Sequence, residues 1–226
     1  MPASAAVAGQ YTLGGDAAHG GNRLTYSDKA AETNNVTFSL AGGEVVLHDA
    51  GAPVVQATDP ATGLPRGLSC RIIDAQTVGC PLANAGQAIR FLAVNADVGD
   101  DVVTNATDIP SILNGEQGND TLTGGSAADT LNGDGGIDTL DGGAGDDVIE
   151  TDGHDAATGY GGERDIVTCG PGNDTAKIDR KDTVDDVQPP FTANFTPGSP
   201  TTCESVVFEG TPVGTTPPPG PPPPPA

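Results

Sequence analysis

Residues 115–150 read GEQGNDTLT, GGSAADTLN, GDGGIDTLD and GGAGDDVIE when they are divided into nines. The aspartates of these units stand nine residues apart, and each is followed two residues later by leucine or isoleucine. They are Asp120, Asp129, Asp138 and Asp147. A fixed period of this kind predicts one structural unit that is stacked on copies of itself.

Each unit has room for only a very short strand, because a glycine-rich turn takes up most of its length. The three residues after each aspartate carry one aliphatic side chain, which in a strand points to one face of the sheet. Stacked about 4.8 Å apart, these side chains form a column that no single unit could bury alone. Glycine permits the positive φ angles of tight turns. We therefore expect a solenoid of short strands and tight turns.

The repeated aspartates also impose an electrostatic requirement on such a stack. Carboxylates at this spacing repel one another strongly unless a cation lies between them. The donors are all oxygen, from carboxylates and main-chain carbonyls, and they suit a hard cation such as Ca²⁺. The period thus predicts calcium binding together with the fold.

The units match the pattern G-G-x-G-x-D-x-U-x, in which U is aliphatic, so the stretch resembles the RTX, or haemolysin-type, calcium-binding repeat family. The resemblance implies an all-β fold, a right-handed parallel β-roll (β-solenoid) in which six residues turn, three form a strand and two units complete one coil. It also implies that Asp carboxylates and Gly carbonyls chelate Ca²⁺ between coils. The implied metal ligands are Gly115, Gly118, Asp120, Gly124, Asp129, Gly133, Gly135, Asp138, Gly142, Asp147, Asp165, Gly172 and Asp174.

A coil of eighteen residues places every second aspartate on the same edge of the roll. One edge is expected to carry Asp129, Asp147 and Asp165, and the other Asp120, Asp138, Ala156 and Asp174. The fifth unit, residues 151–159, has lost its aspartate and its aliphatic residue. We expect a defective or looped coil there, with Asp152 or Asp155 as a substitute ligand.

Other units depart from the pattern in smaller ways. Ala127 and Glu163 stand where the third glycine is expected, so the turns before Asp129 and Asp165 are predicted to chelate less well. The seventh unit, residues 169–177, is intact apart from its leading cysteine, and residues 96–104 form an early copy that includes Asp101. Because Asp120 lies nineteen residues after Asp101, the insert 105–114 is predicted to loop out between coils.

Composition limits the classes of protein to which the chain can belong. It has 226 residues, a formal net charge of −22, 33 glycines, 20 prolines, no tryptophan and 4% aromatic residues. So few aromatic residues argue against a thick globular core. The acidity disfavours binding to nucleic acid and anionic membranes and favours cations. Disorder in the absence of a bound cation remains an alternative.

The part of the chain before the repeats, from Gly9 to Asn95, reads as β structure. Residues 36–40 alternate in polarity and lead through the turn Gly42-Gly43 to a second apolar run at 45–47. Further apolar runs stand at 54–55, 72–73 and 89–94, and no segment shows a helical period with caps. We expect a β-rich leader that caps the open end of the roll, because solenoid ends need covering.

The two ends of the chain have different compositions. Residues 1–8 are small and uncharged, like the end of a secretory signal, so we hypothesise that the true start lies upstream or that a signal was removed. Residues 217–226 are almost entirely proline, which predicts an extended, disordered tail with no capacity to form a core. No apolar run is long enough for a transmembrane helix. The expected divisions are a flexible start (1–8), a leader (9–95), the roll (96–187), a closing segment (188–210) and the polyproline tail (211–226).

The four cysteines predict disulfides rather than a metal–thiolate site. An even count in a chain of extracellular type favours disulfides, and no C-x-x-C motif or neighbouring histidine supports zinc. We prefer the local pairs Cys70 with Cys80 and Cys169 with Cys203, although the sequence leaves the crossed pairings open. The segment from Cys169 to Cys203-Glu204 resembles the closing segment of secreted actinobacterial-type repeats, and a bridge there would clamp the last coil.

Motifs for catalysis are missing from the sequence. The glycines at 142–145 lack the lysine and the helix of a phosphate loop, and residues 132–143 end in glycine where an EF-hand requires glutamate. The carboxylates recur periodically, so no single pair stands out as in a glycosidase. The three histidines are isolated, and no G-x-S-x-G or H-E-x-x-H occurs. We therefore predict that the protein is not an enzyme.

Three functions remain in view. The first is a secreted calcium-binding β-roll whose folding is coupled to the ion. The second is a structural or adhesive cell-surface module that binds a cell-wall or matrix partner. The third, an accessory to an extracellular enzyme, has little support because the leader lacks a nucleophile and a base. We favour the first, with calcium ions as the partner and neither nucleic-acid binding nor membrane insertion.

Overall fold

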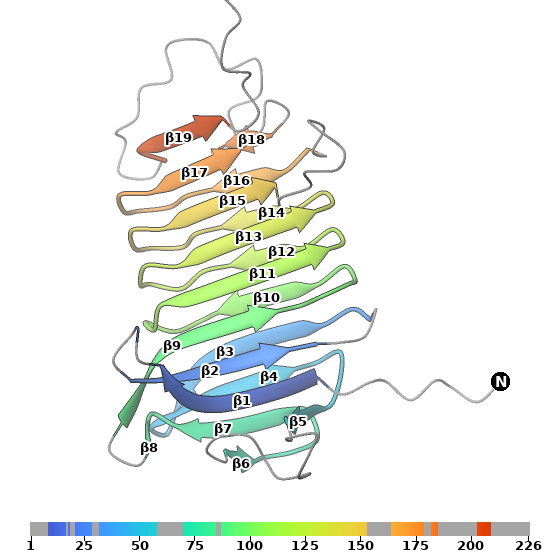
Figure 1. Cartoon of the computed structure of the whole chain (residues 1–226), viewed down its shortest axis with the longest axis vertical. Coiled ribbons are helices and arrows are strands. Elements are labelled where there is room, and N and C mark those ends of the chain that lie inside the picture. The colour runs from blue at the N-terminus through green and yellow to red at the C-terminus, as the bar shows by residue number, and fades with distance from the viewer. Residues whose placement is uncertain are drawn as a thin grey trace, which may run out of the picture.

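A computed structural model describes residues 9–16, 18, 21–28, 32–57, 70–84, 87–152, 164–178, 182–184 and 203–208. Its described residues form nineteen β-strands and no helix, so none of them belongs to a helix that could span a membrane. The strands lie in two sheets that stack face to face along the length of the molecule (Figure 1). The predicted all-β fold is confirmed. The predicted flexible start and the polyproline tail lie outside the described residues.

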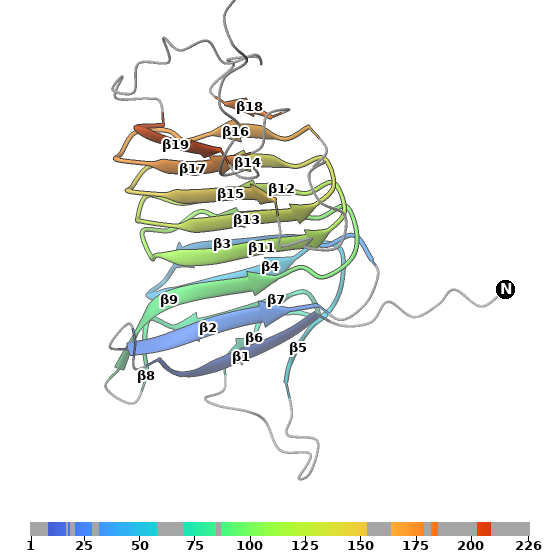
Figure 2. The same cartoon turned by 45° about the horizontal axis from the view of Figure 1, so that its top comes forward.

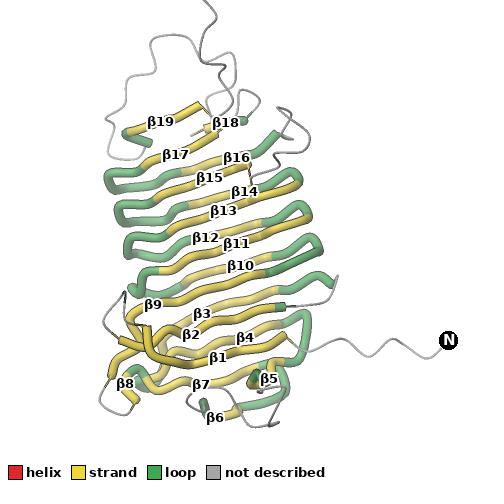
Figure 3. Tube along the Cα trace, viewed as in Figure 1, coloured by secondary structure: helices red, strands yellow, loops and turns green. Residues whose placement is uncertain are grey.

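The roll is built from strands that alternate between the two sheets. One sheet contains β9 (Gln87–Asn95), β11 (Ser111–Gln117), β13 (Thr130–Gly135), β15 (Val148–Asp152), β17 (Thr175–Ile178) and β19 (Ser205–Phe208). The other contains β10 (Val102–Asn105), β12 (Thr121–Thr123), β14 (Thr139–Asp141), β16 (Ile166–Thr168) and β18 (Thr183–Val184). All neighbours within these two sets are parallel, and tight loops join the sheets at both edges (Figure 3).

The strand register confirms that two nonapeptides make one coil. Leu113 pairs with Leu131 in one sheet, and Leu122 pairs with Leu140 in the other, so each step is eighteen residues. Strands as short as β12 and β14 have three residues and place only their central side chain inward. This is the division into turn and strand that the sequence period predicts.

The core of the roll is two aliphatic columns, one from each sheet. Every member is fully buried or nearly so, and the members are Val94, Leu113, Leu131, Ile149 and Ala176 in one column and Val103, Leu122, Leu140, Val167 and Val184 in the other. Each coil contributes about two side chains to this core, so no coil can bury its apolar surface without its neighbours.

Leu131→Ala is expected to lower the free energy of unfolding by about 2–5 kcal/mol, because Leu131 is fully buried in the middle of its column. Urea unfolding of the calcium-saturated protein measures the effect. Ile137→Ala is the control, since Ile137 lies in the same coil with its side chain 53% exposed. Equal losses in the two variants would contradict the assignment of the core.

The leader continues both sheets beyond the first repeat coil. β2 (Gly21–Ser27) pairs in parallel with β9, and β3 (Asn35–Ala41) pairs in parallel with β10, so β2 and β3 form a first coil. Beyond them the pairing becomes antiparallel, through β1 (Gly9–Asp16), β4 (Glu44–Asp49) and β7 (Thr77–Pro81). The short strands β5 (Val54–Gln56), β6 (Arg71–Ile72) and β8 (Ala83–Asn84) complete this end (Figure 2).

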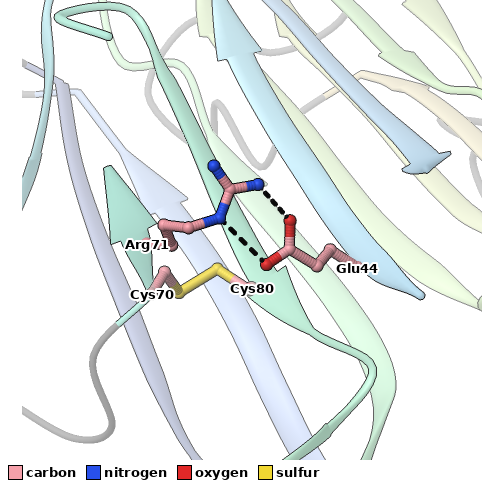
Figure 4. A network of polar contacts seen from close by, with 4 residues as sticks. All are labelled: Glu44, Cys70, Arg71 and Cys80. Carbon is pink, nitrogen blue, oxygen red and sulfur yellow. Dashed lines mark hydrogen bonds and ion pairs between the residues drawn. A yellow bond between two sulfur atoms is a disulfide. The ribbon is translucent and has the colours of Figure 1, made fainter. Parts of the chain in front are cut away.

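Two disulfides fix the ends of the described structure, with the local pairing that we preferred. Cys70 is bonded to Cys80 beside β6, where Arg71 also forms an ion pair with Glu44 of β4 at 2.6 Å (Figure 4). Cys169, in the turn before β17, is bonded to Cys203, which precedes β19. The second bond attaches the closing segment to the last described coil.

The prediction that residues 105–114 loop out is wrong. Residues 111–117 form β11, and the step from Val103 to Leu113 is ten residues instead of nine. The extra residue is absorbed within the turn, because the Asn105 side chain accepts hydrogen bonds from both the backbone and the hydroxyl of Thr107. The insert therefore forms half of one coil, like a nonapeptide, with one additional residue in its turn.

The fifth unit interrupts the register, as expected. β15 pairs with β17 and β14 pairs with β16 across steps of twenty-seven residues, so both sheets skip one nonapeptide. Residues 153–163 lie outside the described part of the chain. The proposed substitute ligand Asp155 is among them, and the side chain of Asp152 is not described.

Candidate metal centre

Acidic side chains at the ends of the turns form two ladders, one along each edge of the roll. The first ladder comprises Asp101, Asp120, Asp138, Asp165 and Asp182, and the second comprises Asp129, Asp147, Asp174 and Glu204, with Ser111 in place of an acid at its first position. Within each ladder the side chain of one coil accepts a hydrogen bond from the backbone N–H of the equivalent residue one coil earlier, at 2.7–3.1 Å. The period thus fixes both the position and the orientation of each carboxylate.

The ladder carboxylates are buried, and some of their oxygens lack a protein partner. Asp120 and Asp147 are each 1% exposed. In both, Oδ1 accepts the hydrogen bond from the preceding coil, whereas Oδ2 is buried without any hydrogen-bond partner in the described structure. Leaving a charged oxygen in this state costs several kcal/mol in proteins generally, so each Oδ2 needs a proton or a cation.

The leading glycine of each turn makes the space around this second oxygen. A Cβ atom on Gly115 would lie 2.3 Å from Oδ2 of Asp120, and one on Gly142 would lie 2.8 Å from Oδ2 of Asp147. Any other residue would therefore press against the carboxylate. These glycines leave the oxygen accessible from the turn.

The surroundings raise the pKa of the ladder carboxyls. Burial raises the pKa of Asp120 to about 7, and the neighbouring carboxylates of Asp138 and Asp101 act in the same direction against the lowering effect of the backbone hydrogen bond. Burial likewise raises the pKa of Asp147 to about 7, with Asp129 and Asp174 adding to it. The ladders are thus held in a state that favours neutralisation at physiological pH.

Glycines farther along the turns bring main-chain carbonyls close to the next coil. Gly118 and Gly136 have φ angles of 145° and 143°, and a Cβ atom on them would lie 1.6 Å from the Gly99 oxygen and 1.7 Å from the Gly118 oxygen. On the other edge, a Cβ atom on Gly172 would lie 1.6 Å from the Gly145 oxygen. Both edges therefore stack carbonyl groups tightly beside the carboxylates.

These donors fit calcium better than a transition metal. In the described part of the chain, no three His, Cys, Asp or Glu side chains converge as a ready-made metal cluster. Each rung instead offers carboxylates from two coils together with main-chain carbonyls of the turns. Ca²⁺ accepts such mixed oxygen ligands with flexible geometry, and the unpartnered Oδ2 atoms above the glycines provide the places for it.

The expected division of the aspartates between the edges is wrong for the later coils. Asp165 follows Asp138 on the first ladder, and Asp174 follows Asp147 on the second. Because the fifth unit is skipped by both sheets, every aspartate after it moves to the opposite edge from the one that counting by eighteen predicts. Ala156 lies outside the described residues.

The other glycines of the turns have distinct places. Gly136, eighteen positions after Gly118, is the glycine that stacks on it, and the predicted ligand Gly135 stands directly before Gly136. Gly124 and Gly133 lie against Asp129 and Asp138 as the other leading glycines do. Ala127 occupies its turn with its carbonyl against Gly145, and Glu163 lies outside the described residues.

Four ladder positions were missing from the predicted ligands. Asp101 belongs to the early copy, Ser111 stands eighteen residues before Asp129, and Asp182 and Glu204 end the two ladders. Ser111 and Glu204 each have an aliphatic residue two positions later, as the repeat aspartates do. This two-residue spacing to an aliphatic residue is the sequence signal that could have identified these ladder positions.

Gly136→Ala is expected to destabilise the calcium-saturated protein by more than about 1 kcal/mol, because its positive φ and the nearby Gly118 oxygen exclude a side chain. Gly135→Ala is the matched control. A Cβ atom on Gly135 meets only the Glu116 oxygen, at 3.6 Å, and should change stability little. Thermal unfolding of both variants tests this, and an equal or larger loss for the Gly135 variant would show that close packing at Gly136 does not limit stability.

Comparison with protein families agrees with this geometry. Residues 111–140, 123–155 and 132–163 match the model of the RTX calcium-binding nonapeptide repeat, with four copies. Searches of curated proteins and of solved structures returned no significant match. The family match gives no support to an actinobacterial origin. Residues 111–163 are RTX calcium-binding nonapeptide repeats, and their described part, residues 111–152, has buried aspartates and two parallel sheets and folds as a β-roll.

Proposed function

We propose that this protein is a secreted calcium-binding β-roll, and that its roll folds when the ion binds. The observation that carries the proposal is the pair of buried carboxylate ladders, in which Oδ2 of Asp120 and of Asp147 has no protein partner and faces a glycine. A ligand that binds only the folded state stabilises that state, so calcium would shift the chain from unfolded to folded.

The two carboxylate oxygens have separate roles in this proposal. Oδ1 is held by the backbone N–H of the preceding coil, which fixes the side chain before any ion arrives. In Asp120 and Asp147, Oδ2 is left to bind calcium, with carbonyls of the glycine-rich turns completing the shell. Oδ2 of Asp129 also accepts a hydrogen bond from the Gly125 backbone at 2.6 Å. The proposed side-chain ligands are Asp120, Asp129, Asp138, Asp147, Asp165 and Asp174, to which the structure adds Asp101, Asp182 and Glu204 as candidates.

An extracellular location fits the same chemistry. RTX repeats and disulfides are features of extracellular proteins, and both occur here. Outside the cell calcium is abundant and disulfides persist, whereas both conditions fail in the cytoplasm. We propose that the chain stays loosely folded before export and completes its roll outside. Its role in this proposal is binding and structural rather than catalytic.

Two neighbouring aspartates provide a matched test of the ligand assignment. Asp147→Asn should remove at least one calcium ion from the stoichiometry measured by isothermal titration calorimetry, because it neutralises a buried ladder carboxylate. Asp146→Asn carries the same charge change on an exposed residue that accepts a hydrogen bond from the Asn173 backbone, and should keep every ion. If Asp147→Asn binds as many ions as the wild type with equal affinity, the ligands lie elsewhere.

A structural or adhesive surface role is the second candidate. It is favoured by the continuity of both sheets from the leader strands to β18 and β19, which makes a single stiff body. Such a body would act as a spacer that presents a partner-binding surface, with cell wall or matrix as the partner. Calcium-dependent sedimentation of the protein with isolated cell walls tests this role, and no co-sedimentation at any calcium concentration would exclude that partner.

A further inference from the structure

Asn34, directly before β3, takes the place of a repeat aspartate at the start of the first ladder. Asn35 pairs with Val102, so Asn34 lies one coil before Asp101. The backbone N–H of Asn34 donates to Oδ1 of Asp101 at 2.6 Å, which is the contact that every later rung repeats. Asn34 is therefore a ladder position in the leader, with an amide where the repeats have a carboxylate.

The Asn34 side chain sits among more oxygens than it can satisfy. Its Nδ2 lies 3.1 Å from Oδ1 of Asp101, 3.3 Å from Oδ2 of Asp28 and from the Glu32 carbonyl, and 3.5 Å from the Ala96 carbonyl. An amide nitrogen carries only two protons, so it can serve two of these four acceptors. Asp101 also has its Oδ2 buried without a partner, in a side chain that is 1% exposed.

The other end of the Asn34 amide shows the complementary mismatch. The Tyr26 hydroxyl faces Oδ2 of Asp49 at 2.7 Å and Oδ1 of Asn34 at 3.1 Å, but it has one proton for these two acceptors. The oxygen and nitrogen of an amide exchange places by a simple rotation. In the rotated form, Nδ2 of Asn34 donates a hydrogen bond to the Tyr26 oxygen, and the Tyr26 hydroxyl donates to Asp49. Oδ1 of Asn34 then lies beside the four oxygens that surrounded Nδ2.

That rotated arrangement matches a calcium shell in its spacing. In that form the end of the Asn34 side chain presents an oxygen instead of a donor to the four oxygens around it, and a cation among them would offset their mutual repulsion. Oxygens bound to one Ca²⁺ at about 2.3–2.6 Å lie about 3 to 3.6 Å from their neighbours in the shell. The four distances from the Asn34 side-chain terminus, 3.1–3.5 Å, fall within this range.

We propose that Asp28, Asn34 and Asp101, together with the main-chain carbonyls of Glu32 and Ala96, form a further Ca²⁺ site that joins the leader to the first repeat coil. The site lies outside the residues that match the RTX repeat and goes beyond the repeat sites. It uses two carboxylates, one amide oxygen and two carbonyls, which are ligands typical of Ca²⁺. An ion there links Asp28, Glu32 and Asn34 to the turn before β10 and so fixes the register of the first coil.

Asn34→Asp gives the sharpest test, because it keeps the shape of the side chain and removes its only donor group. The variant should bind calcium at this site at least tenfold more tightly than the wild type, and it should unfold more readily in a chelator. Isothermal titration calorimetry and urea unfolding measure the two effects. If calcium affinity and chelator stability both equal those of the wild type, the amide contacts are purely structural and the proposal fails.

Asp28→Asn should have the opposite effect on binding. It removes one carboxylate from the site, and the calcium stoichiometry should fall by one ion. Asp100→Asn is the charge-matched control, since Asp100 is an exposed neighbour of Asp101 that bonds Asn119 instead. Tb³⁺, used alone as a calcium substitute and excited through tyrosine, adds a local readout, because the Tyr26 hydroxyl lies 3.1 Å from the Asn34 side chain.

The terbium measurement separates this site from the repeat sites. Wild type, Asp100→Asn and the repeat variant Asp147→Asn should all give tyrosine-sensitised emission, whereas Asp28→Asn should lose at least half of it. Equal emission from Asp28→Asn and Asp100→Asn, with equal calcium stoichiometry, would overturn the junction site and leave the repeat sites standing. If instead the wild type binds no calcium at the repeat sites but still gives emission that depends on Asp28, the proposed function is refuted and the junction site is not.

Discussion

Removal of calcium at pH 7.5 is expected to unfold the roll between β10 and β19 while the leader keeps most of its structure. The reason is electrostatic. Neighbouring acids on each ladder are about 4.8 Å apart, the spacing of adjacent strands. At that distance two carboxylates repel by about 3 kcal/mol even with an effective dielectric constant of about 20. A whole domain is stable by only about 5–15 kcal/mol, so a few uncompensated rungs suffice to unfold it.

The leader lacks this vulnerability because its stability has other sources. Antiparallel pairs join β1 to β2, β3 to β4 and β4 to β7 around buried Tyr11, Phe38 and Leu47, and the Cys70–Cys80 disulfide closes the outer end of the leader. It therefore provides an internal control within the same molecule. The contrast between the two regions should survive in any buffer that removes calcium without reducing the disulfides.

Hydrogen exchange measured residue by residue gives the test. The backbone amides of Asp120, Asp129 and Asp138 donate to ladder carboxylates and should exchange at least 100-fold faster in a chelator than in calcium. The amides of Val45 and Leu47 in β4 should change much less. Magnesium should not restore protection, since it demands a tighter octahedral shell. Equal protection of the ladder amides with and without calcium would remove the basis of calcium-coupled folding.

The sequence period predicted the parts of the fold that depend on local repetition. The spacing of Asp120, Asp129, Asp138 and Asp147, with their aliphatic partners, was enough to predict the eighteen-residue coil, the buried columns and the turn-edge position of the acids. These features follow because each nonapeptide forms one turn and one short strand in the same way.

The membership of the two ladders could not be predicted in this way, because it depends on whether a degenerate unit keeps its place in the stack. A nonapeptide without its aspartate and its leucine has no core side chain to bury, so excluding it from the sheets costs little. Each such exclusion exchanges the edges for all later residues. Asp165 and Asp174 changed edges for this reason, although both remain on ladders.

Asn34 shows a different limit of sequence reasoning. The leader has no nine-residue period, and its only coil is formed by β2 and β3 before the pairing turns antiparallel. Val36 follows Asn34 at the two-residue spacing that also marks Ser111, but without a nine-residue period this spacing alone does not identify a ladder position. The pairing of Asn35 with Val102 places Asn34 at the start of the first ladder. The contribution of the leader to the candidate calcium sites therefore required the tertiary structure.

Without calcium, the roll should be most stable in mild acid and should lose stability as the pH rises through about 7. The pKa values of Asp120 and Asp147 rise from 3.8 to about 7 on folding, mainly through burial. Asp101 shifts in the same direction, to about 6. A carboxyl whose pKa is higher in the folded state holds its proton more tightly there, so between pH 4 and pH 7 folding takes up protons.

The sign of the pH dependence follows directly. The stabilising contribution of each proton is complete below the pKa of the unfolded state and disappears as the pH rises past the pKa of the folded state. The urea midpoint of the metal-free protein should therefore decrease as the pH rises from 5 to 8. Calcium must reverse this trend, because it binds the deprotonated carboxylates and competes with protons. Urea unfolding at pH 5 and pH 8, each with chelator and with excess calcium, measures the trend, and the roll should already be unfolded before urea is added in chelator at pH 8. A metal-free protein that becomes more stable towards pH 8 would show that the ladder acids are not the groups that link folding to the ion, since ionising them without a counter-ion can only weaken the stack.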